Sequence, residues 1–372
     1  MGLWDGTLEV VVSGMSGWKD RRILVTGHTG FKGSWLCQWL LDEGAEVAGF
    51  ALAPEAPPAL FSALELASRL RHVVGDIRDA AAIRTCIHDF RPEVVLHLAA
   101  QPLVRRSYRE PALTWSTNVL GTVNLLEAVR DCPAVRACVV VTSDKCYENR
   151  EWVWGYREDE AMGGHDPYSA SKGATELAVA SWRRSFPDMA PVATGRAGNV
   201  IGGGDWNADR IVTDFVAAMQ AGTTLQLRNP GATRPWQHVL EPLSGYLMLA
   251  RRLLEPTGRT YAEGWNFGPA VEGVATVEAL ARELVAAWGS GRVEAATVKP
   301  TLHEAGTLRL DCSKAAARLG WQALWGMPET VRRTARWYRD FARGASATEL
   351  CRADLDAYRQ ASSHAGARSA GP

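Results

Sequence analysis

The chain has 372 residues, of which 47% are hydrophobic and 22% charged, a composition that excludes disordered and fibrous proteins. Its 41 basic and 41 acidic residues cancel, so we expect no nucleic-acid partner and no attraction to an anionic membrane. No apolar run reaches the roughly 18 residues of a membrane span. Any anionic ligand must therefore be held by local charges.

Cysteine and histidine usage indicates the compartment and the kind of site. The seven cysteines are odd in number, scattered, and several lie inside apolar runs, which predicts free thiols in a reducing cytoplasm. The eight histidines form no pattern with metal-ligand spacing. We therefore expect a cytoplasmic protein without a metal site.

Short β-branched runs and helical patterns alternate after an N-terminal extension over residues 1–17, which holds a second possible start at Met15. The runs over residues 18–195 are RILVTG, AEVAGFAL, RHVVGD, EVVLHLAA, ACVVVTS and PVATGRAG. Because parallel strands need crossover connections, this alternation predicts a Rossmann-type, doubly wound parallel α/β sheet.

The pattern becomes looser in the second half of the chain. Residues 196–350 carry Gly- and Trp-rich loops, and the helices that we expect there lie near 209–221, 240–254, 276–288 and 329–343. We predict a smaller substrate-binding region, partly interleaved with the first domain. We expect residues 351–372 to form a C-terminal tail, and its last dozen residues, ASSHAGARSAGP, are small and polar and are expected to be frayed.

The sequence GHTGFKG follows the first strand and opens the helical stretch SWLCQWLLDEG. Glycines at such a turn let a pyrophosphate approach the helix N-terminus, where free N–H groups favour an anion. The context favours dinucleotide binding over a purely structural turn, and the G-x-x-G-x-x-G spacing is similar to that of short-chain dehydrogenase/reductases. The expected contacts are Gly27, Thr29, Gly30, Phe31, Lys32 and Gly33.

The second strand, residues 46–52, ends without the acidic residue that usually binds the adenosine ribose. The nearest acid, Glu55, follows a proline, so the choice between NAD and NADP stays open at this strand. Other strand ends supply further expected cofactor contacts, although each also has a bland interpretation as a loop. They are Asp76, Ile77, Leu98, Ala99, Ala100 and Gln101, joined by Asn118.

Tyr168 and Lys172 are four residues apart in a helical pattern and so share one face. The ordinary pKa of tyrosine, near 10, leaves about a thousandth of the phenol ionised at neutral pH, and a fixed ammonium with a positive nicotinamide ring favours the phenolate. Ser143 ends the apolar run ACVVVT, at the edge where parallel sheets bind ligands. These three residues predict a site that oxidises a hydroxyl group.

Seven motifs together resemble, over residues 18–345, the extended short-chain dehydrogenase/reductases that act on nucleotide sugars, and within them the 4,6-dehydratases of the CDP-glucose type. The motifs are GHTGFKGSWL, LAAQPLVRRSY, VTSDKCYEN, PYSASKGATE, RAGNVIGGGDW, RPWQHVLEPLSGYL and LRLDCSKAAARLGW. The resemblance implies NAD as cofactor, CDP-glucose or a related nucleotide sugar as substrate, and deoxysugar biosynthesis. It also implies a homodimer formed through the helices over 113–130 and 168–184.

The resemblance gives roles to two further residues. In these dehydratases C4 of the sugar is oxidised, water leaves across C5 and C6, and the hydride returns to C6. Asp144 would protonate the departing C6 oxygen, whereas Lys145 stands where related dehydratases carry a glutamate base, so the identity of the C5 base stays open. The alternative is a solvated surface pair.

The resemblance also implies contacts to the nucleotide sugar. Asn199 and Arg234 would contact the diphosphate, where a guanidinium binds two oxygens at once. Leu225–Leu227 is an extended segment suited to line the base, and Trp206 and Trp236 are candidates for stacking. Each candidate arginine has a structural alternative, and the complete expected set is Arg196, Asn199, Arg210, Arg234 and Arg309.

Three alternatives to this function remain open from sequence. A nucleotide-sugar 4-epimerase or reductase would use the same scaffold, but has no evident need for Asp144 and Lys145. A dehydratase for another nucleotide hexose would differ only in base recognition, which no residue explains from first principles. A non-catalytic dinucleotide sensor would be expected to lose Tyr168 or Lys172, and both are present.

Overall fold

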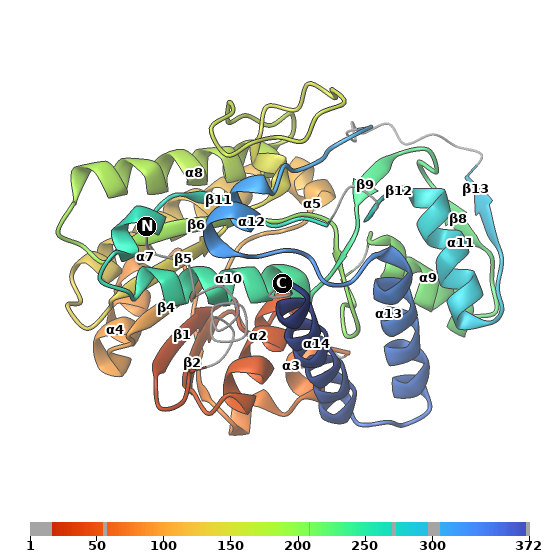
Figure 1. Ribbon diagram of the computed structural model, residues 1–372, viewed down its shortest axis with the longest axis horizontal. Helices are drawn as coiled ribbons and strands as arrows, with labels where there is room; N and C mark the ends of the chain where they lie inside the picture. The colour runs from red at the N-terminus through yellow and green to blue at the C-terminus, as the bar shows by residue number, and fades with distance from the viewer. Residues whose placement is uncertain (1–16, 55–57, 208, 270–272, 297–305, 370–372) are drawn as a thin grey trace.

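The computed structural model describes residues 17–54, 58–207, 209–269, 273–296 and 306–369, so Met15 and nearly all of the N-terminal extension lie outside it. Its centre is a seven-stranded sheet in the order β11-β6-β5-β4-β1-β2-β3, with every neighbouring pair parallel (Figure 1). The strands are β1 Arg22–Thr26, β2 Glu46–Ala51, β3 Arg71–Val74, β4 Val94–His97, β5 Ala137–Val141, β6 Val192–Arg196 and β11 Gly264–Asn266.

The predicted fold class is confirmed, because all six predicted runs form strands of one parallel sheet. The seventh strand, β11, was not predicted, since three residues are too few for a periodic signal. It pairs with β6, which brings a late segment of the chain back to the first domain.

Helices cover both faces because successive strand residues point to opposite sides. In β5, Val139 and Val141 pack on one side, whereas Cys138 and Val140 pack on the other. The first side is covered by α2 Phe31–Asp42 and α10 Leu240–Leu253. The second side is covered by α4 Ala80–Phe90, α7 Gly121–Arg130 and α8 Pro167–Ser185.

Smaller elements form the second region, beyond the carboxyl ends of the strands (Figure 1). Its two-stranded sheets pair β7 with β10, β8 with β13 and β9 with β12. The strands are β7 Val200–Ile201, β8 Leu225–Leu227, β9 Thr233–Pro235, β10 Gln237–His238, β12 Val274–Thr276 and β13 Val293–Ala295. The α-helices after β6 that have not yet been named, apart from the last one, are α9 Ile211–Gln220, α11 Val277–Trp288, α12 Ser313–Leu319 and α13 Met327–Ala342. Three short helices belong to the first half of the chain: α3 Leu60–Ala63, α5 Val104–Arg109 and α6 Pro111–Trp115.

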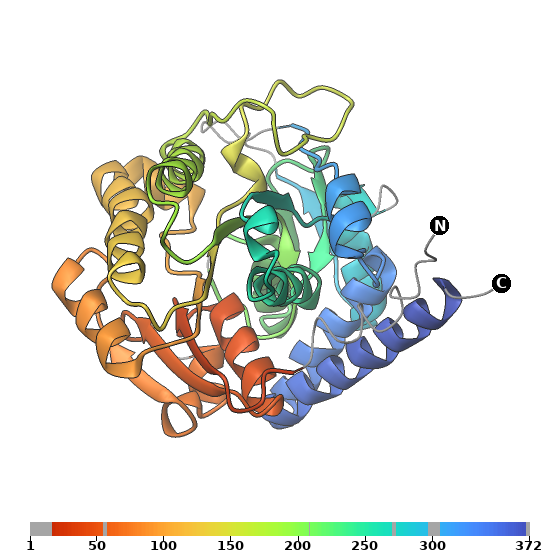
Figure 2. The ribbon, with the colours of Figure 1, turned by 60° about the vertical axis from the view of Figure 1, so that its left-hand side comes forward.

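The expectation of a C-terminal tail over 351–372 is wrong for the residues that the structure describes. Residues 347–369 form helix α14, Ala347–Ser369, which lies beside α13 and α2 (Figures 1 and 2). Leu355 and Tyr358 are fully buried, and Arg352 forms a 3.0 Å ion pair with Asp42 of α2. The small polar residues at the end of the chain concealed the apolar face of the preceding turns.

A buried carboxylate joins α10 to this C-terminal helix. Glu241 has no exposed surface and accepts hydrogen bonds from the Trp325 backbone N–H at 2.7 Å and the Tyr358 hydroxyl at 2.7 Å. The Leu324 N–H is a third donor. Burial raises the pKa of Glu241 to about 7, although these hydrogen bonds oppose the shift.

This carboxyl group makes the stability of the fold depend on pH. Folded Glu241 keeps its proton up to about pH 7, whereas its ordinary pKa is 4.5, so the folded state binds more protons in between. Linkage then lowers the free energy of unfolding by about 3 kcal/mol as pH rises through this window. Glu241→Gln, whose amide oxygen still accepts from both backbone N–H groups, should remove this dependence. Urea unfolding at several pH values would contradict this account if both proteins changed equally.

Candidate functional site

A cleft of about 1490 Å³ opens between the carboxyl ends of the parallel strands and the second region. It lies next to the boundary between β1 and β4, where the strand order reverses and α/β sheets bind ligands. Its volume exceeds the 300–1,000 Å³ that is typical of a single small-molecule pocket. The cleft therefore has room for two ligands.

The glycine loop between β1 and α2 forms one end of this cleft. Gly27 has φ +72°, and a Cβ on it would lie 2.6 Å from the Ala99 nitrogen. A Cβ on Gly33 would lie 2.2 Å from the Gly27 oxygen. The backbone thus turns within a space that no side chain would fit, and α2 presents its free N–H groups to the cleft. These features fit a dinucleotide pyrophosphate.

Most of the expected cofactor contacts line this cleft. They are Gly27, Thr29, Gly30, Phe31, Lys32, Gly33, Asp76, Ile77, Leu98, Ala99, Ala100 and Gln101. Leu52, after β2, also lines the cleft and is 61% exposed. An apolar side chain therefore lies at the strand end where an acidic residue usually binds the adenosine ribose. The alternative acid, Glu55, lies outside the described residues.

Asn118 does not line the cleft, so the expectation of a direct contact is corrected. Its side chain is buried, where Oδ1 accepts from the Gln101 N–H at 2.8 Å and Nδ2 donates to the Ser171 hydroxyl at 2.8 Å. These bonds connect the loop after β4 to helix α8. Asn118 therefore holds cofactor-side backbone in place instead of reaching the cleft itself.

Ser143, Tyr168 and Lys172 meet in the cleft beside the end of β5. The Lys172 ammonium donates to the Val141 carbonyl at 3.2 Å, and burial lowers its pKa to about 8. Burial raises the pKa of Tyr168 to about 12, although a hydrogen bond with Ser143 opposes the shift. The chain alone thus keeps the phenol protonated at neutral pH, and proton loss requires further positive charge in the cleft.

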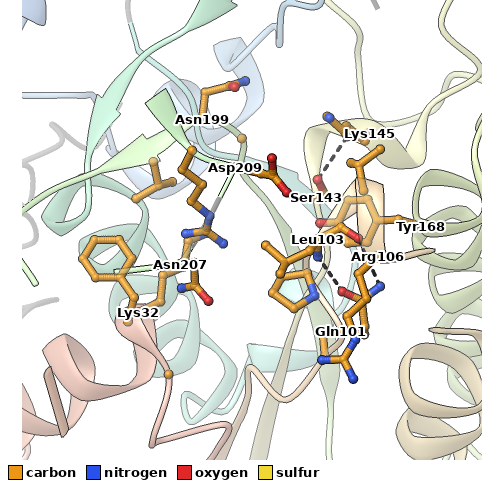
Figure 3. Close-up of a pocket in the computed structure, with 18 of the residues that line it drawn as sticks. Lys32, Gln101, Leu103, Arg106, Ser143, Lys145, Tyr168, Asn199, Asn207 and Asp209 are labelled. Atoms are coloured by element: carbon orange, nitrogen blue, oxygen red, sulfur yellow. Dashed lines mark hydrogen bonds between the residues drawn. The ribbon is translucent and has the colours of Figure 1, made fainter. Parts of the chain in front are cut away.

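Asp144 and Lys145 stand directly beside these groups in the short 3₁₀ turn Asp144–Cys146. Figure 3 shows Lys145, Ser143 and Tyr168 together on one side of the pocket, across from Lys32 and Asn207. Asp144 is 1% exposed, and its carboxylate accepts from the Ser143 hydroxyl at 2.9 Å. The alternative of a solvated surface pair is therefore wrong for Asp144.

Three of the five expected substrate contacts line the cleft, namely Asn199, Arg210 and Arg234. Arg210 forms an ion pair with Asp205. Arg234 donates to the Thr233 and Gly306 carbonyls at 2.9 and 3.2 Å. The two guanidinium groups are thus held in place from the second region.

Arg196 and Arg309 are not among the described residues that line the cleft. The expected substrate contact is corrected for Arg196 and stays a prediction for Arg309. Arg196 is buried, with a 2.8 Å ion pair to Glu176 and a 2.7 Å hydrogen bond to the Tyr147 hydroxyl. Because the Arg196 guanidinium pairs with a buried carboxylate, it has a structural role. Beside Arg309, it is Leu308 that lines the cleft. The sequence signal that could have indicated this role is Glu176, a carboxylate one turn after Lys172 on the buried side of α8.

The aromatic and extended candidates also border the cleft. Trp206 packs against Trp337 and Phe341, with ring centroids 5.8 and 5.6 Å apart. Trp236 donates its indole N–H to the Ala275 carbonyl at 3.1 Å. Leu225–Leu227, strand β8, lies along the same wall.

Charged groups that sequence reasoning missed also shape the cleft. Arg105, after β4, and Asp209, in the second region, approach within 3.5 Å and so connect the two sides. Asp205 pairs with Arg210. Lys32, expected only as part of the loop, places a half-buried amine in the cleft, and desolvation with the nearby Arg210 and Lys172 charges lowers its pKa to about 8. Spacing in one sequence carries no signal for such contacts across the cleft.

Three general properties hold in the part of the chain that the structure describes. No group of three or more His, Cys, Asp or Glu side chains there is arranged to hold a metal ion. None of its helices combines the length and apolar character needed to cross a membrane. All seven cysteines are free thiols, and six of them are buried.

Known proteins resemble the chain over nearly all of its length. The family described as GDP-mannose 4,6 dehydratase matches residues 24–334. A CDP-glucose 4,6-dehydratase from Salmonella typhimurium is 48% identical over 92% of this chain and 98% of its own length. A UDP-glucose 4-epimerase from Mycolicibacterium smegmatis is 30% identical over 86% of this chain and 99% of its own length.

A solved structure shows the same architecture. It is a dTDP-glucose 4,6-dehydratase from Streptomyces venezuelae with NAD bound, which is 26% identical. The similarity has a TM-score of 0.73 and covers 86% of this chain and 97% of the other.

Proposed function

Because the chain belongs to the GDP-mannose 4,6-dehydratase family, we propose that it removes water from a nucleotide-activated hexose by an internal oxidation and reduction. The substrate is CDP-D-glucose and the product is CDP-4-dehydro-6-deoxy-D-glucose. The 48% identity to a CDP-glucose 4,6-dehydratase supports this nucleotide. NAD is the cofactor, supported by the glycine loop and by the NAD-bound dehydratase of the same fold.

One observation carries the proposal: a buried acid stands next to the tyrosine of the oxidation site. Asp144 lies in the same cleft wall as Tyr168 and contacts Ser143. A 4-epimerase needs only to remove and return a hydride at C4. Water loss also needs an acid at the C6 hydroxyl and a base at C5. Asp144 and Lys145 supply two such groups.

The first half of the reaction uses the groups on β5 and α8. NAD⁺ bound in the cleft supplies a hydride acceptor, which later becomes the donor. Tyr168 takes the proton of the C4 hydroxyl, and Ser143 shares a hydrogen bond with the same oxygen. Lys172, fixed on the Val141 carbonyl, stabilises the phenolate by its positive charge. The sugar is left with a ketone at C4, which acidifies the hydrogen at C5.

The second half uses the residues of the 3₁₀ turn. Lys145, which lines the cleft next to Asp144, is the group assigned to take the C5 proton. The bond between C6 and its oxygen breaks, and this oxygen receives the proton of Asp144 and leaves as water. Return of the hydride to C6 and of a proton to C5 completes the 6-deoxy product. The net change is the loss of one water molecule.

Binding of the nucleotide diphosphate is assigned to the second region. Arg210 and Arg234 are the guanidinium groups that line the cleft and suit phosphate oxygens. Strand β8 lines the same cleft, and we assign contact with the base to it. With a net charge of zero, the chain relies on these local cations.

We also propose that the protein is a cytoplasmic homodimer. Trp115, Leu120 and Leu177 are large apolar side chains that are 41%, 59% and 60% exposed, and they lie on the adjoining segments α6 to α7 and on α8. Exposed apolar groups on neighbouring helices favour a shared interface. Sedimentation of the purified protein as a monomer would contradict the dimer.

The proposed cytoplasmic location is supported by the free cysteines, which agree with a reducing compartment.

Incubation with CDP-, dTDP-, GDP- and UDP-glucose tests the proposed function. The expected result is loss of one water, measured by mass, from CDP-glucose at the highest kcat/KM. Fast dehydration of another nucleotide hexose would correct the base. A product of unchanged mass with inverted C4 would instead identify an epimerase.

The two halves of the reaction should respond to different substitutions. Tyr168→Phe should reduce C4 oxidation by roughly 10²- to 10⁴-fold, because the hydroxyl proton loses its acceptor. Asp144→Asn should keep C4 oxidation and slow water loss by a similar factor. Reduced nicotinamide absorbance reports the first step, and product mass reports the second.

Matched variants away from the cleft serve as controls for these substitutions. Tyr261→Phe removes a hydroxyl, and Asp356→Asn neutralises a carboxylate that is 64% exposed. Neither residue is among those that line the cleft. Full dehydration by Asp144→Asn would show that another group is the acid.

A further inference from the structure

The turn after β6 packs directly against the proposed acid. Asp144 lies so close to Gly198 that a Cβ on this glycine would be 1.8 Å from Oδ2 of the carboxylate. The next residue, Asn199, donates from Nδ2 to the same Oδ2 at 3.3 Å. The Ser143 hydroxyl occupies Oδ1 at 2.9 Å. Both oxygens of this buried carboxylate therefore have a defined partner.

The turn is itself held from behind by a buried glutamine. Gln237, with no exposed surface, donates from Nε2 to the Gly198 carbonyl at 3.1 Å and to the Phe267 carbonyl at 3.0 Å. Its backbone N–H donates to the Asn199 carbonyl at 3.3 Å. The pairing of β7 with β10 continues this contact. Asn199 is thus presented to Asp144 from a fixed backbone.

Asparagine suits this position in two ways. Its φ is +48°, in the left-handed region that Asn and Asp tolerate better than most residues. Its side chain carries both a donor and an acceptor. Nδ2 can donate to a lone pair of Oδ2 whether the carboxyl group is ionised or protonated, which leaves the carboxyl proton free to point at the substrate. One residue can therefore hold Asp144 before and after proton transfer.

We propose that Asn199 is the positioning residue of the dehydration acid, which holds Oδ2 of Asp144 toward the substrate in both protonation states. This inference rests on the proposed function, since it assigns a partner to the acid of that reaction. It differs from the diphosphate contact expected for Asn199 from sequence resemblance. Asn199 lines the same pocket as Ser143 and Lys145 (Figure 3), and its amide contacts the proposed acid directly.

The test uses two substitutions that tolerate the left-handed backbone. Asn199→Gly removes the amide without backbone strain, and Asn199→Asp replaces the donor by a second carboxylate. Both should lower kcat for water loss from CDP-glucose by roughly 100-fold, the effect of a misplaced catalytic group. KM, the affinity for NAD and the single-turnover rate of C4 oxidation should each stay within about threefold of the wild-type value. This change is far smaller than the expected loss of kcat. Reduced nicotinamide should then accumulate before water is lost.

The split between kcat and KM distinguishes the two roles of Asn199. A raised KM with unchanged kcat would overturn the proposal and support a diphosphate contact. Full activity of Asn199→Gly would overturn it as well. If the wild type loses no water from any nucleotide hexose, the proposed function itself fails.

Crystal structures of the wild type and Asn199→Gly give a readout that is independent of turnover. The proposal expects the Asp144 carboxylate to shift by more than roughly 0.5 Å, the tolerance of a preorganised site. A carboxylate that stays in place without the amide would overturn it. Gly198→Ala is a second variant, because the added Cβ must displace Asp144 and should slow water loss even if Asn199 is intact.

Discussion

The hydrogen bond from Lys172 to the Val141 carbonyl is the contact on which the site depends. It joins helix α8 to the carboxyl end of β5 and lies in the protein interior. Tyr168, one turn earlier on α8, is thereby placed beside Ser143, and Ser143 in turn contacts Asp144. The groups proposed for oxidation, at the end of β5 and on α8, and those proposed for elimination, in the turn after β5, share this wall because the contact joins α8 to β5. Without this contact, Tyr168 on α8 would not be held beside Ser143 and Asp144 at the end of β5.

The electrostatics of the cleft follow from burial more than from net charge. The chain is neutral overall, yet Lys32, Lys172 and Arg210 are gathered around one cavity with Asp144 and Asp205. Burial lowers the pKa of both lysines to about 8 and raises that of Tyr168 to about 12. The proton of Tyr168 is thus held firmly until ligands add positive charge, which couples deprotonation to a filled site.

Sequence predicted what depends on local pattern and missed what depends on distant contacts. The six predicted strands, the glycine loop and the Tyr168 to Lys172 spacing all carry strong local periodicity or spacing, and the structure has them as expected. Arg196 and Asn118 were misassigned because their partners, Glu176 and Gln101, lie 20 and 17 residues away. The buried face of α14 was hidden by a polar end. Strand β11 is too short for any periodic signal.

The central claim is that one cleft moves a hydride within a single sugar, from C4 to C6. CDP-glucose that carries deuterium at C4 tests this most directly. The account predicts a 4-keto-6-deoxy product with the deuterium at C6, detected by mass and proton NMR. Deuterium that remains at C4, or is lost to solvent with no label at C6, would contradict it.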